Sequence, residues 1–385
     1  MKNLLDFDNY ILESKSIYKL DDETKSILLD LDEKYHKLIE KFRTKYVAQT
    51  VDNIREEFDK FMNARKMGQK YFPQLDIKNS QYDEKMYDSF TKLLDEFEKI
   101  KDKCYIAKFY LEKIHAMRAS LEQRKAIDEG TYEPGDNPVD KELYKEALQC
   151  IEEHPYKKPD FDKERTKDSE EALEAIEDAL DELGYDFEVK IDTGMLPRMN
   201  VKMGKVNINK SSKFSDEDID GLIAHEIEGH VGRRYYGKKT GLWLFAYGTQ
   251  SSSTYDEGLA VWLSLNKVKH KKDNVMFNIA MKTCISYLMY EKDFCELFDW
   301  LKKKAPEMTD YTAFKTVMRP RRKNKNCEIR SGEPMISYFK GWKMVNNMDS
   351  KMRDDILHYN IGPDQIFELE NIKEFLKVNK FEPLK

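Results

Sequence analysis

The feature that most constrains this chain is a run of metal-ligating residue types, His-Glu-Ile-Glu-Gly-His at 225–230, followed by an Asp-Glu pair at 256–257. Two imidazoles and one carboxylate can hold a catalytic zinc ion and leave one position open for water. On a regular α-helix, residues five apart point about 140° away from each other, so His225 and His230 could not both reach one ion. The run therefore predicts a helix that carries a π-bulge or that loosens near Gly229.

The predicted zinc ligands are His225, His230 and Glu257, because Glu257 begins an apolar stretch suited to a buried helix. Asp256 is the alternative third ligand; otherwise it orients a ligand or caps the helix. Glu226 stands beside the first histidine, where it could act as general base toward a zinc-bound water and pass the proton to the leaving amine. The competing interpretation is a surface helix with two solvated histidines.

Composition excludes several classes of protein. The net charge of −6 over 385 residues argues against general nucleic-acid binding, which needs a basic surface. No stretch approaches the ~20 apolar residues of a membrane span, and the first residues are too acidic for a signal peptide. Five cysteines without a CxxC pair indicate reduced thiols. We therefore expect a soluble, cytoplasmic protein.

Hydrophobic periodicity predicts helices over most of residues 1–150, with a break at 68–73, and again from about 241 onward. A helix is expected from Ser169, its cap, to Leu183, with Gly184 ending it. Alternating patterns at 187–191, 199–203 and 206–209 predict strands, and Ser215 starts the helix that carries His225. The fold class is therefore mainly α with a small β-sheet (α+β), with a helical N-terminal region at 1–160 and a catalytic domain at 161–385.

The sequences AHEIEGHVGRR from residue 224 and YDEGLAVW from residue 255 resemble the microtubule-associated tyrosine carboxypeptidase family, whose bacterial relatives carry a Gln-Glu-Gly-Leu-Ala motif. That family is similar in using His-Glu-x-x-x-His and a downstream Glu as zinc ligands, so the five-residue spacing is its own feature. Asp256 stands here where the family has Gln or Glu. The resemblance covers roughly residues 70–350 and implies a zincin-like metallopeptidase domain with a Zn²⁺ cofactor.

Two further segments are similar to this family: an Arg-rich segment at 316–322 and a Tyr-x-x-Gly element that begins at Tyr338. A carboxypeptidase must bind a free C-terminal carboxylate, which suits planar Arg side chains. Arg319 and Arg322 are the first candidates, and a solvated basic loop is the alternative. Tyr338 is the candidate donor to the oxyanion of the reaction. Further candidates are Arg233 and Arg234 for the carboxylate and Tyr235 and Tyr236 for the oxyanion.

The predicted function is that of a zinc metallocarboxypeptidase that removes a C-terminal residue, with tyrosine or another aromatic as the candidate, from a peptide or protein. An acidic, tubulin-like tail would suit the basic patch around Arg319. The strand at 206–210 could pair with substrate as an edge strand, or be ordinary sheet. The alternative is a non-catalytic helical interaction protein whose metal is structural or absent. A closed site that binds both Asp256 and Glu257 would favour it.

Overall fold

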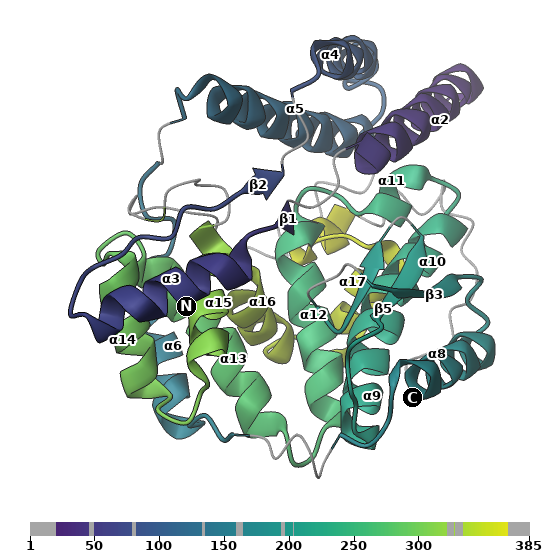
Figure 1. Cartoon of the computed structure of the whole chain (residues 1–385). Coiled ribbons are helices and arrows are strands. Elements are labelled where there is room, and N and C mark those ends of the chain that lie inside the picture. Colours follow the sequence, from purple (N-terminus) through teal and green to yellow (C-terminus); the bar gives the residue numbers. More distant parts are fainter. Residues whose placement is uncertain are drawn as a thin grey trace.

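The structure, a computed structural model, describes residues 21–45, 50–78, 82–132, 135–158, 165–193, 197–202, 204–321, 327 and 334–368. It is mainly helical with one small mixed sheet (Figure 1), so the predicted α+β class is confirmed at that level. No helix in these residues combines the length and the apolar character needed to cross a membrane.

The first part of the chain is helical, as its periodicity predicts. A two-stranded antiparallel ribbon, β1 with β2, interrupts it, and the predicted break at 68–73 contains no helix. In order, the elements are α2 (Asp22–Lys45), β1 (Thr50–Val51), α3 (Ile54–Lys66), β2 (Ile77–Lys78), α4 (Glu84–Glu98), α5 (Ala107–Glu129) and α6 (Lys141–Glu153).

The three predicted strands form one sheet: β3 (Glu188–Asp192), β4 (Met199–Lys202) and β5 (Lys205–Asn209). The strand order is β3-β5-β4, with β5 parallel to β3 and antiparallel to β4 across a turn at Gly204, where φ is +74°. Of the two interpretations of the segment at 206–210, the edge strand is therefore wrong and ordinary sheet is confirmed. The segment at 206–210 lies mainly in β5, and β5 is the central strand, paired with β3 on one side and with β4 on the other.

Helix ends follow their local chemistry, with one correction. Helix α8 (Ser169–Leu183) is capped by Asp168, not by Ser169, because the Asp168 carboxylate accepts from two backbone N–H groups of the first turn. Gly184 ends α8 with φ +67°, as predicted. Ser215 caps α9 (Asp216–Leu222) through a capping box with Asp218, also as predicted.

After α9 the described chain is almost entirely helical, and the predicted helical C-terminal part is confirmed to that extent. Helix α12 lies at its centre and packs against α9, η1 and α16. The elements are η1 (Ile223–Val231), α10 (Gly232–Lys239), α11 (Trp243–Tyr247), α12 (Ser252–Lys267), α13 (Lys272–Leu288), α14 (Phe294–Lys304), α15 (Asp310–Met318), η2 (Arg319–Arg321), α16 (Ser337–Asn346), α17 (Ser350–Tyr359) and η3 (Pro363–Glu368).

Three apolar clusters hold these elements together. The first joins α2, α4 and α5 to α11, α12 and α17; the second joins α3 and α6 to α13, α14 and α15; the third joins α8 and the sheet to α9 and η1. The first two clusters draw residues from both sides of residue 160. The division into regions 1–160 and 161–385 therefore stays a prediction.

A buried carboxylate fixes α2 to the later part of the chain. Asp32 is 3% exposed and accepts hydrogen bonds from the Tyr110 hydroxyl (2.5 Å) and from the backbone N–H groups of Trp243 (2.9 Å) and Leu244 (3.2 Å). These bonds give acceptors to the backbone N–H groups at the start of α11, and they join three segments that are remote in sequence. Figure 1 shows α2 beside α11 as a result.

Candidate metal centre and catalytic cavity

The helix that carries both histidines is a π-helix over nine residues, Ile223–Val231. Its hydrogen bonds run from residue i to i+5, so each turn holds one more residue than an α-helical turn, and residues five apart share a face. The rings of His225 and His230 accordingly lie 5.1 Å apart, centroid to centroid. The predicted helical distortion is confirmed, and it extends beyond the bulge that the spacing requires.

Gly229 was expected to loosen the helix, but in the structure it allows two helices to pack closely. Its φ is not in the left-handed region, so its backbone freedom does not cause the distortion. A Cβ at this position would instead lie 3.0 Å from the Cβ of Ala260 and 3.1 Å from its Cα. The missing side chain therefore lets η1 approach α12 closely enough for groups on the two helices to meet.

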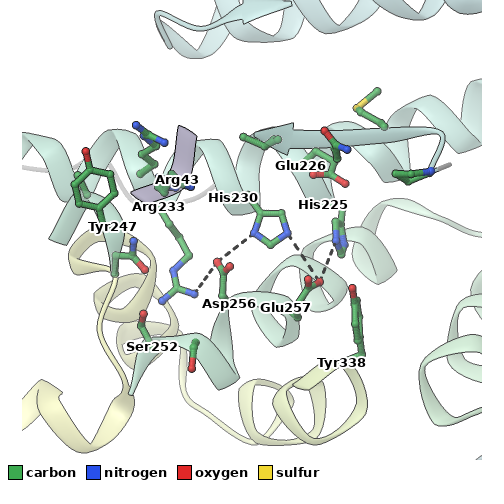
Figure 2. A pocket seen from close by; sticks show the side chains of 18 of the residues that line it. Arg43, His225, Glu226, His230, Arg233, Tyr247, Ser252, Asp256, Glu257 and Tyr338 are labelled. Carbon is green, nitrogen blue, oxygen red and sulfur yellow. Dashed lines mark hydrogen bonds and ion pairs between the residues drawn. The ribbon is translucent and has the colours of Figure 1, made fainter. Parts of the chain in front are cut away.

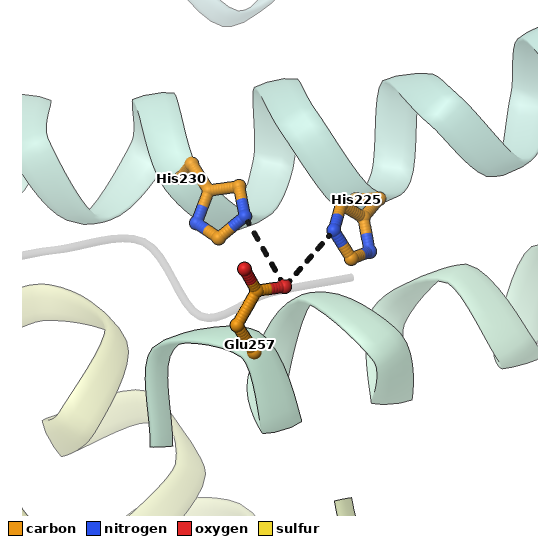
Figure 3. Close-up of side chains that lie close together, drawn as sticks. All are labelled: His225, His230 and Glu257. Atoms are coloured by element: carbon orange, nitrogen blue, oxygen red, sulfur yellow. Dashed lines mark ion pairs between the residues drawn. The ribbon is translucent and has the colours of Figure 1, made fainter. Parts of the chain in front are cut away.

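The first turns of α12 place Glu257 opposite both histidines (Figure 3). Glu257 Oε2 lies 3.5 Å from Nε2 of His225 and 3.9 Å from Nε2 of His230. Taken together, one ligand atom from each of the three residues lies within 4.8 Å of the others. Two ligands of one tetrahedral zinc ion are typically about 3.4 Å apart, from bond lengths of about 2.1 Å.

The chemistry of this donor set fits zinc. Oε2 of Glu257 is buried and accepts no hydrogen bond from the described residues, although two imidazoles face it. Burial would raise the pKa of Glu257, but His225 and His230 hold it at about 2, so the group is a carboxylate at neutral pH. A carboxylate between two imidazole nitrogens could hold a zinc ion once the imidazoles are neutral.

Asp256 faces the other side of His230. Its Oδ1 lies 3.1 Å from Nδ1 of His230 and accepts a hydrogen bond of 3.1 Å from Nη1 of Arg233. Burial alone would lower the pKa of His230, but Asp256 and Glu257 raise it to about 10. Of the roles predicted for Asp256, the geometry matches that of an orienting group, which leaves Nε2 of His230 turned toward Glu257.

A cavity of about 460 Å³ opens on these groups (Figure 2). Glu226 lines it beside the histidines, and burial raises the pKa of the Glu226 carboxyl. Met199, Asn200 and Val201 of the edge strand β4 also line the cavity. Glu226 and the edge strand β4 thus border the same space as the candidate ligands.

The predicted tyrosine and one predicted arginine reach the cavity from other elements. Tyr338, on α16, lines the cavity. Burial raises the pKa of the Tyr338 hydroxyl most, and the negative charge of the nearby Glu257 raises it as well. Nζ of Lys282 lies 3.1 Å from the centroid of the Tyr338 ring. Arg319, the first residue of η2, lines the cavity, whereas Arg322 lies outside the described residues. The intervening Arg321 is fully buried and donates to backbone carbonyls.

The secondary candidates divide between cavity and core. Arg233 and Arg234 line the cavity, whereas the lining includes neither Tyr235 nor Tyr236, and both pack against Tyr185. Sequence reasoning missed two cations that line it, Arg43 of α2 and Lys113 of α5, together with three residues of β4 and with Asn360. No local pattern marks these residues, since each reaches the site through the packing of a remote segment.

A π-helix places two histidines opposite a glutamate of the next helix, with Glu226 in the same cavity, and such a set of groups could hold a metal ion. A comparison of sequences agrees: the profile of the family described as microtubule-associated tyrosine carboxypeptidase matches residues 65–322, and the chain belongs to that family. The description of the family names a carboxypeptidase. The resemblance expected at roughly 70–350 is thus confirmed for most of its length. The matched span begins after α2.

Other comparisons add little. No curated protein is similar enough in sequence to count as a match. Among solved structures, a protein described as a candidate lipoprotein from Colwellia psychrerythraea aligns with a TM-score of 0.44 and 11% identity. The alignment covers 76% of this chain and 63% of the other, so this chain spans less than two thirds of that protein. At this distance the likeness supports no conclusion about function.

Proposed function

We propose that this protein is a zinc-dependent metallocarboxypeptidase that hydrolyses the C-terminal residue, tyrosine or another aromatic, from a peptide or protein. The observation that carries the proposal is the convergence of His225, His230 and Glu257 within 4.8 Å in a chain of a carboxypeptidase family. Those three side chains would hold the ion, with Asp256 orienting His230. Zinc bound there would supply Lewis acidity, which polarises a carbonyl and lowers the pKa of a water molecule.

Glu226 would take the proton of the attacking water and deliver it to the leaving amine. Its burial raises the pKa of its carboxyl, which strengthens it as a base near neutral pH. Tyr338 would donate a hydrogen bond to the oxyanion that develops on the scissile carbonyl. The pKa of its hydroxyl is raised, so the donor proton is retained at neutral pH.

The surroundings of these groups support a peptide substrate. The exposed edge of β4 could pair with an extended peptide, and Arg319 could bind a carboxylate of that peptide. An acidic, tubulin-like tail stays the candidate partner, in keeping with the name of the family. All five cysteines are buried and unpaired, which supports the reducing, cytoplasmic setting proposed for the protein.

The decisive experiment is the Glu226→Gln variant. We expect one zinc per chain by elemental analysis, as in the wild type, and a fall in kcat of about 10²- to 10⁴-fold on peptides ending in Tyr or Phe. The control is Glu228→Gln, which changes the same residue type on the same helix but does not line the cavity, and whose activity should be retained. Full activity in Glu226→Gln would refute the assignment of the base.

The alternative class, an interaction protein with a structural metal, requires a closed site with four protein ligands. One observation weighs against it: Asp256 is turned to Nδ1 of His230 and to Arg233, so it does not face the space between the other three groups. If zinc-loaded wild-type protein left peptides ending in Tyr, Phe and other residues uncleaved, as followed by mass, the alternative would replace the proposal.

A further inference from the structure

The cavity has a strongly basic side next to the metal centre. Arg43 comes from α2, Lys113 from α5, and Arg233 and Arg234 from α10. Figure 2 shows Arg43 and Arg233 on one side of His230, with Tyr338 on the opposite side. We call these four residues the basic cluster. These four residues line the same cavity although they come from three helices that are far apart in the sequence, and this arrangement calls for a physical reason.

Two of the four cations in the basic cluster form ion pairs with described carboxylates. Arg234 lies 3.4 Å from Glu40, and Arg233 lies 3.1 Å from Asp256. Among the described residues, neither Arg43 nor Lys113 lies within ion-pair distance of a carboxylate, although the charge of Glu40 acts on Arg43 and that of Asp256 acts on Lys113. Arg43 lies 5.4 Å from the ring centroid of Tyr247, and Nζ of Lys113 lies 3.5 Å from the carbonyl oxygen of Thr249.

The close approach of these cations has an electrostatic cost. The pKa of the Lys113 ammonium is lowered to about 8: burial lowers it most, Asp256 opposes this, and the nearby Arg43 and Arg233 lower it as well. The guanidinium of Arg234 lies 5.5 Å from the same Tyr247 ring that Arg43 approaches, so these two cations flank one side chain. A negative group in the cavity would relieve this repulsion.

Two further features point to an anion. Arg233 is 1% exposed and lines the cavity, yet its Nε and Nη2 atoms donate no hydrogen bond to any described residue. Buried guanidinium nitrogens are usually hydrogen-bonded, and water or the carboxylate of a ligand in the cavity could supply the acceptor for Arg233. Ser252 and Ser253, the first residues of the 16-residue helix α12, line the same side, so the positive end of that helix faces the cavity.

We propose that Arg43, Lys113 and Arg233 form an anion subsite that takes a carboxylate of the substrate beside the metal centre. The inference rests on the proposed peptidase function and extends it by assigning recognition to the first helices of the chain. Arg43 lies on α2, before the span 65–322 that the family profile matches. The carboxylate can come from two sources, the free C-terminus of the peptide or an acidic side chain close to it.

Direct binding tests this subsite without requiring turnover. The protein is the full chain with the Glu226→Gln substitution, loaded with zinc, and calorimetry measures the Kd of a peptide that ends in Glu-Glu-Tyr. Adding Arg43→Gln should weaken binding about tenfold, as expected for one lost charge-assisted hydrogen bond. Lys113→Met should have a similar effect, and it serves as the second variant if either protein folds poorly. Lys41→Gln, an exposed residue of α2 outside the cavity, is the matched control and should change nothing.

Two altered peptides identify the source of the carboxylate: one has a C-terminal amide, and the other has Gln-Gln in place of Glu-Glu. The peptide that lacks the recognised carboxylate should bind the parent protein about tenfold more weakly and be insensitive to Arg43→Gln. If Arg43→Gln weakens the binding of the parent peptide and of both altered peptides equally, or weakens the binding of none of them, the subsite is refuted.

Cleavage of the same Glu-Glu-Tyr peptide by the zinc-loaded wild type, followed by mass, tests the proposed function separately. Absence of cleavage together with Arg43-dependent binding would refute the peptidase and support the subsite. Cleavage with binding that does not depend on Arg43 or Lys113 would refute only the subsite.

Discussion

The two sides of the cavity are built in different ways. The metal side consists of His225, Glu226, His230 and Glu257, which come from η1 and the start of α12, two helices in direct contact. The basic cluster comes from α2, α5 and α10, of which the first two lie far earlier in the chain. The metal side therefore depends on one helix–helix contact, whereas the basic cluster depends on how remote helices dock.

This difference separates chemistry from recognition. The contact of Gly229 with Ala260 sets the approach of η1 to α12, and nothing in it involves α2 or α5. The position of Arg43 depends on α2, which Asp32 ties to α11. Substitutions of His225, His230 or Glu257 should consequently remove zinc and activity together, and substitutions around the basic cluster should alter peptide binding while zinc stays bound.

The largest effect is expected from His230→Ala, which removes one of three candidate ligands. Two remaining groups do not hold zinc stoichiometrically at micromolar protein, so both zinc content and activity should be lost. Elemental analysis after gel filtration measures the content. His115→Ala, an exposed histidine of α5, should retain one zinc per chain. Unchanged zinc in His230→Ala would mean that the five-residue spacing does not ligate.

Asp256 contacts both sides, His230 on one and Arg233 on the other, and its substitution gives the next largest effect. Asp256→Asn removes the charge that orients His230 and that pairs with Arg233. Loss of such an outer partner typically weakens metal affinity about 10- to 100-fold, which competition with a chelator would measure. Peptide affinity should change as well, because Arg233 loses its partner. Asp220→Asn, exposed on α9, is the control. A change in peptide affinity alone would place Asp256 only on the basic side.

The same contrast explains which parts could be predicted from sequence. The spacing of His225 and His230 forces a departure from α-helical geometry if both bind one ion, so the distortion was predictable from residues 225–230 alone. Strands β3, β4 and β5 and the helix end at Gly184 follow equally local rules. Features that depend on about one helical turn or one strand could therefore be predicted from the sequence.

The features that were predicted wrongly or missed depend either on a choice between two similar neighbouring residues or on long-range packing. Asp168 and Ser169 are both good capping residues, and only the backbone conformation decides that Asp168 caps α8. The central place of β5 depends on the path of the chain through three strands. Arg43 and Lys113 are two of 66 basic residues, and no spacing relates either to the histidines, so their convergence on the cavity depends on tertiary packing alone.

The smallest expected effect tests whether the basic cluster can be disturbed alone. Asp32→Ala would leave Tyr110, Trp243 and Leu244 without their buried acceptor, at a cost of about 3 kcal/mol in the free energy of unfolding. Because Asp32 ties α2 to α11, the helix that carries Arg43 should loosen. Well below the melting temperature, we expect an unchanged zinc content and a Kd for the Glu-Glu-Tyr peptide raised a few-fold.

Asp30→Ala, on the same helix with a side chain 67% exposed, is the matched control for both stability and binding. Hydrogen exchange should show faster exchange in α2 of Asp32→Ala and unchanged protection in η1 and α12. If zinc were lost in parallel with peptide affinity, the metal side would depend on the docking of α2, and the two sides of the cavity would form one cooperative unit. Retained zinc with weakened binding would instead establish that the first helices serve recognition, independently of the metal centre.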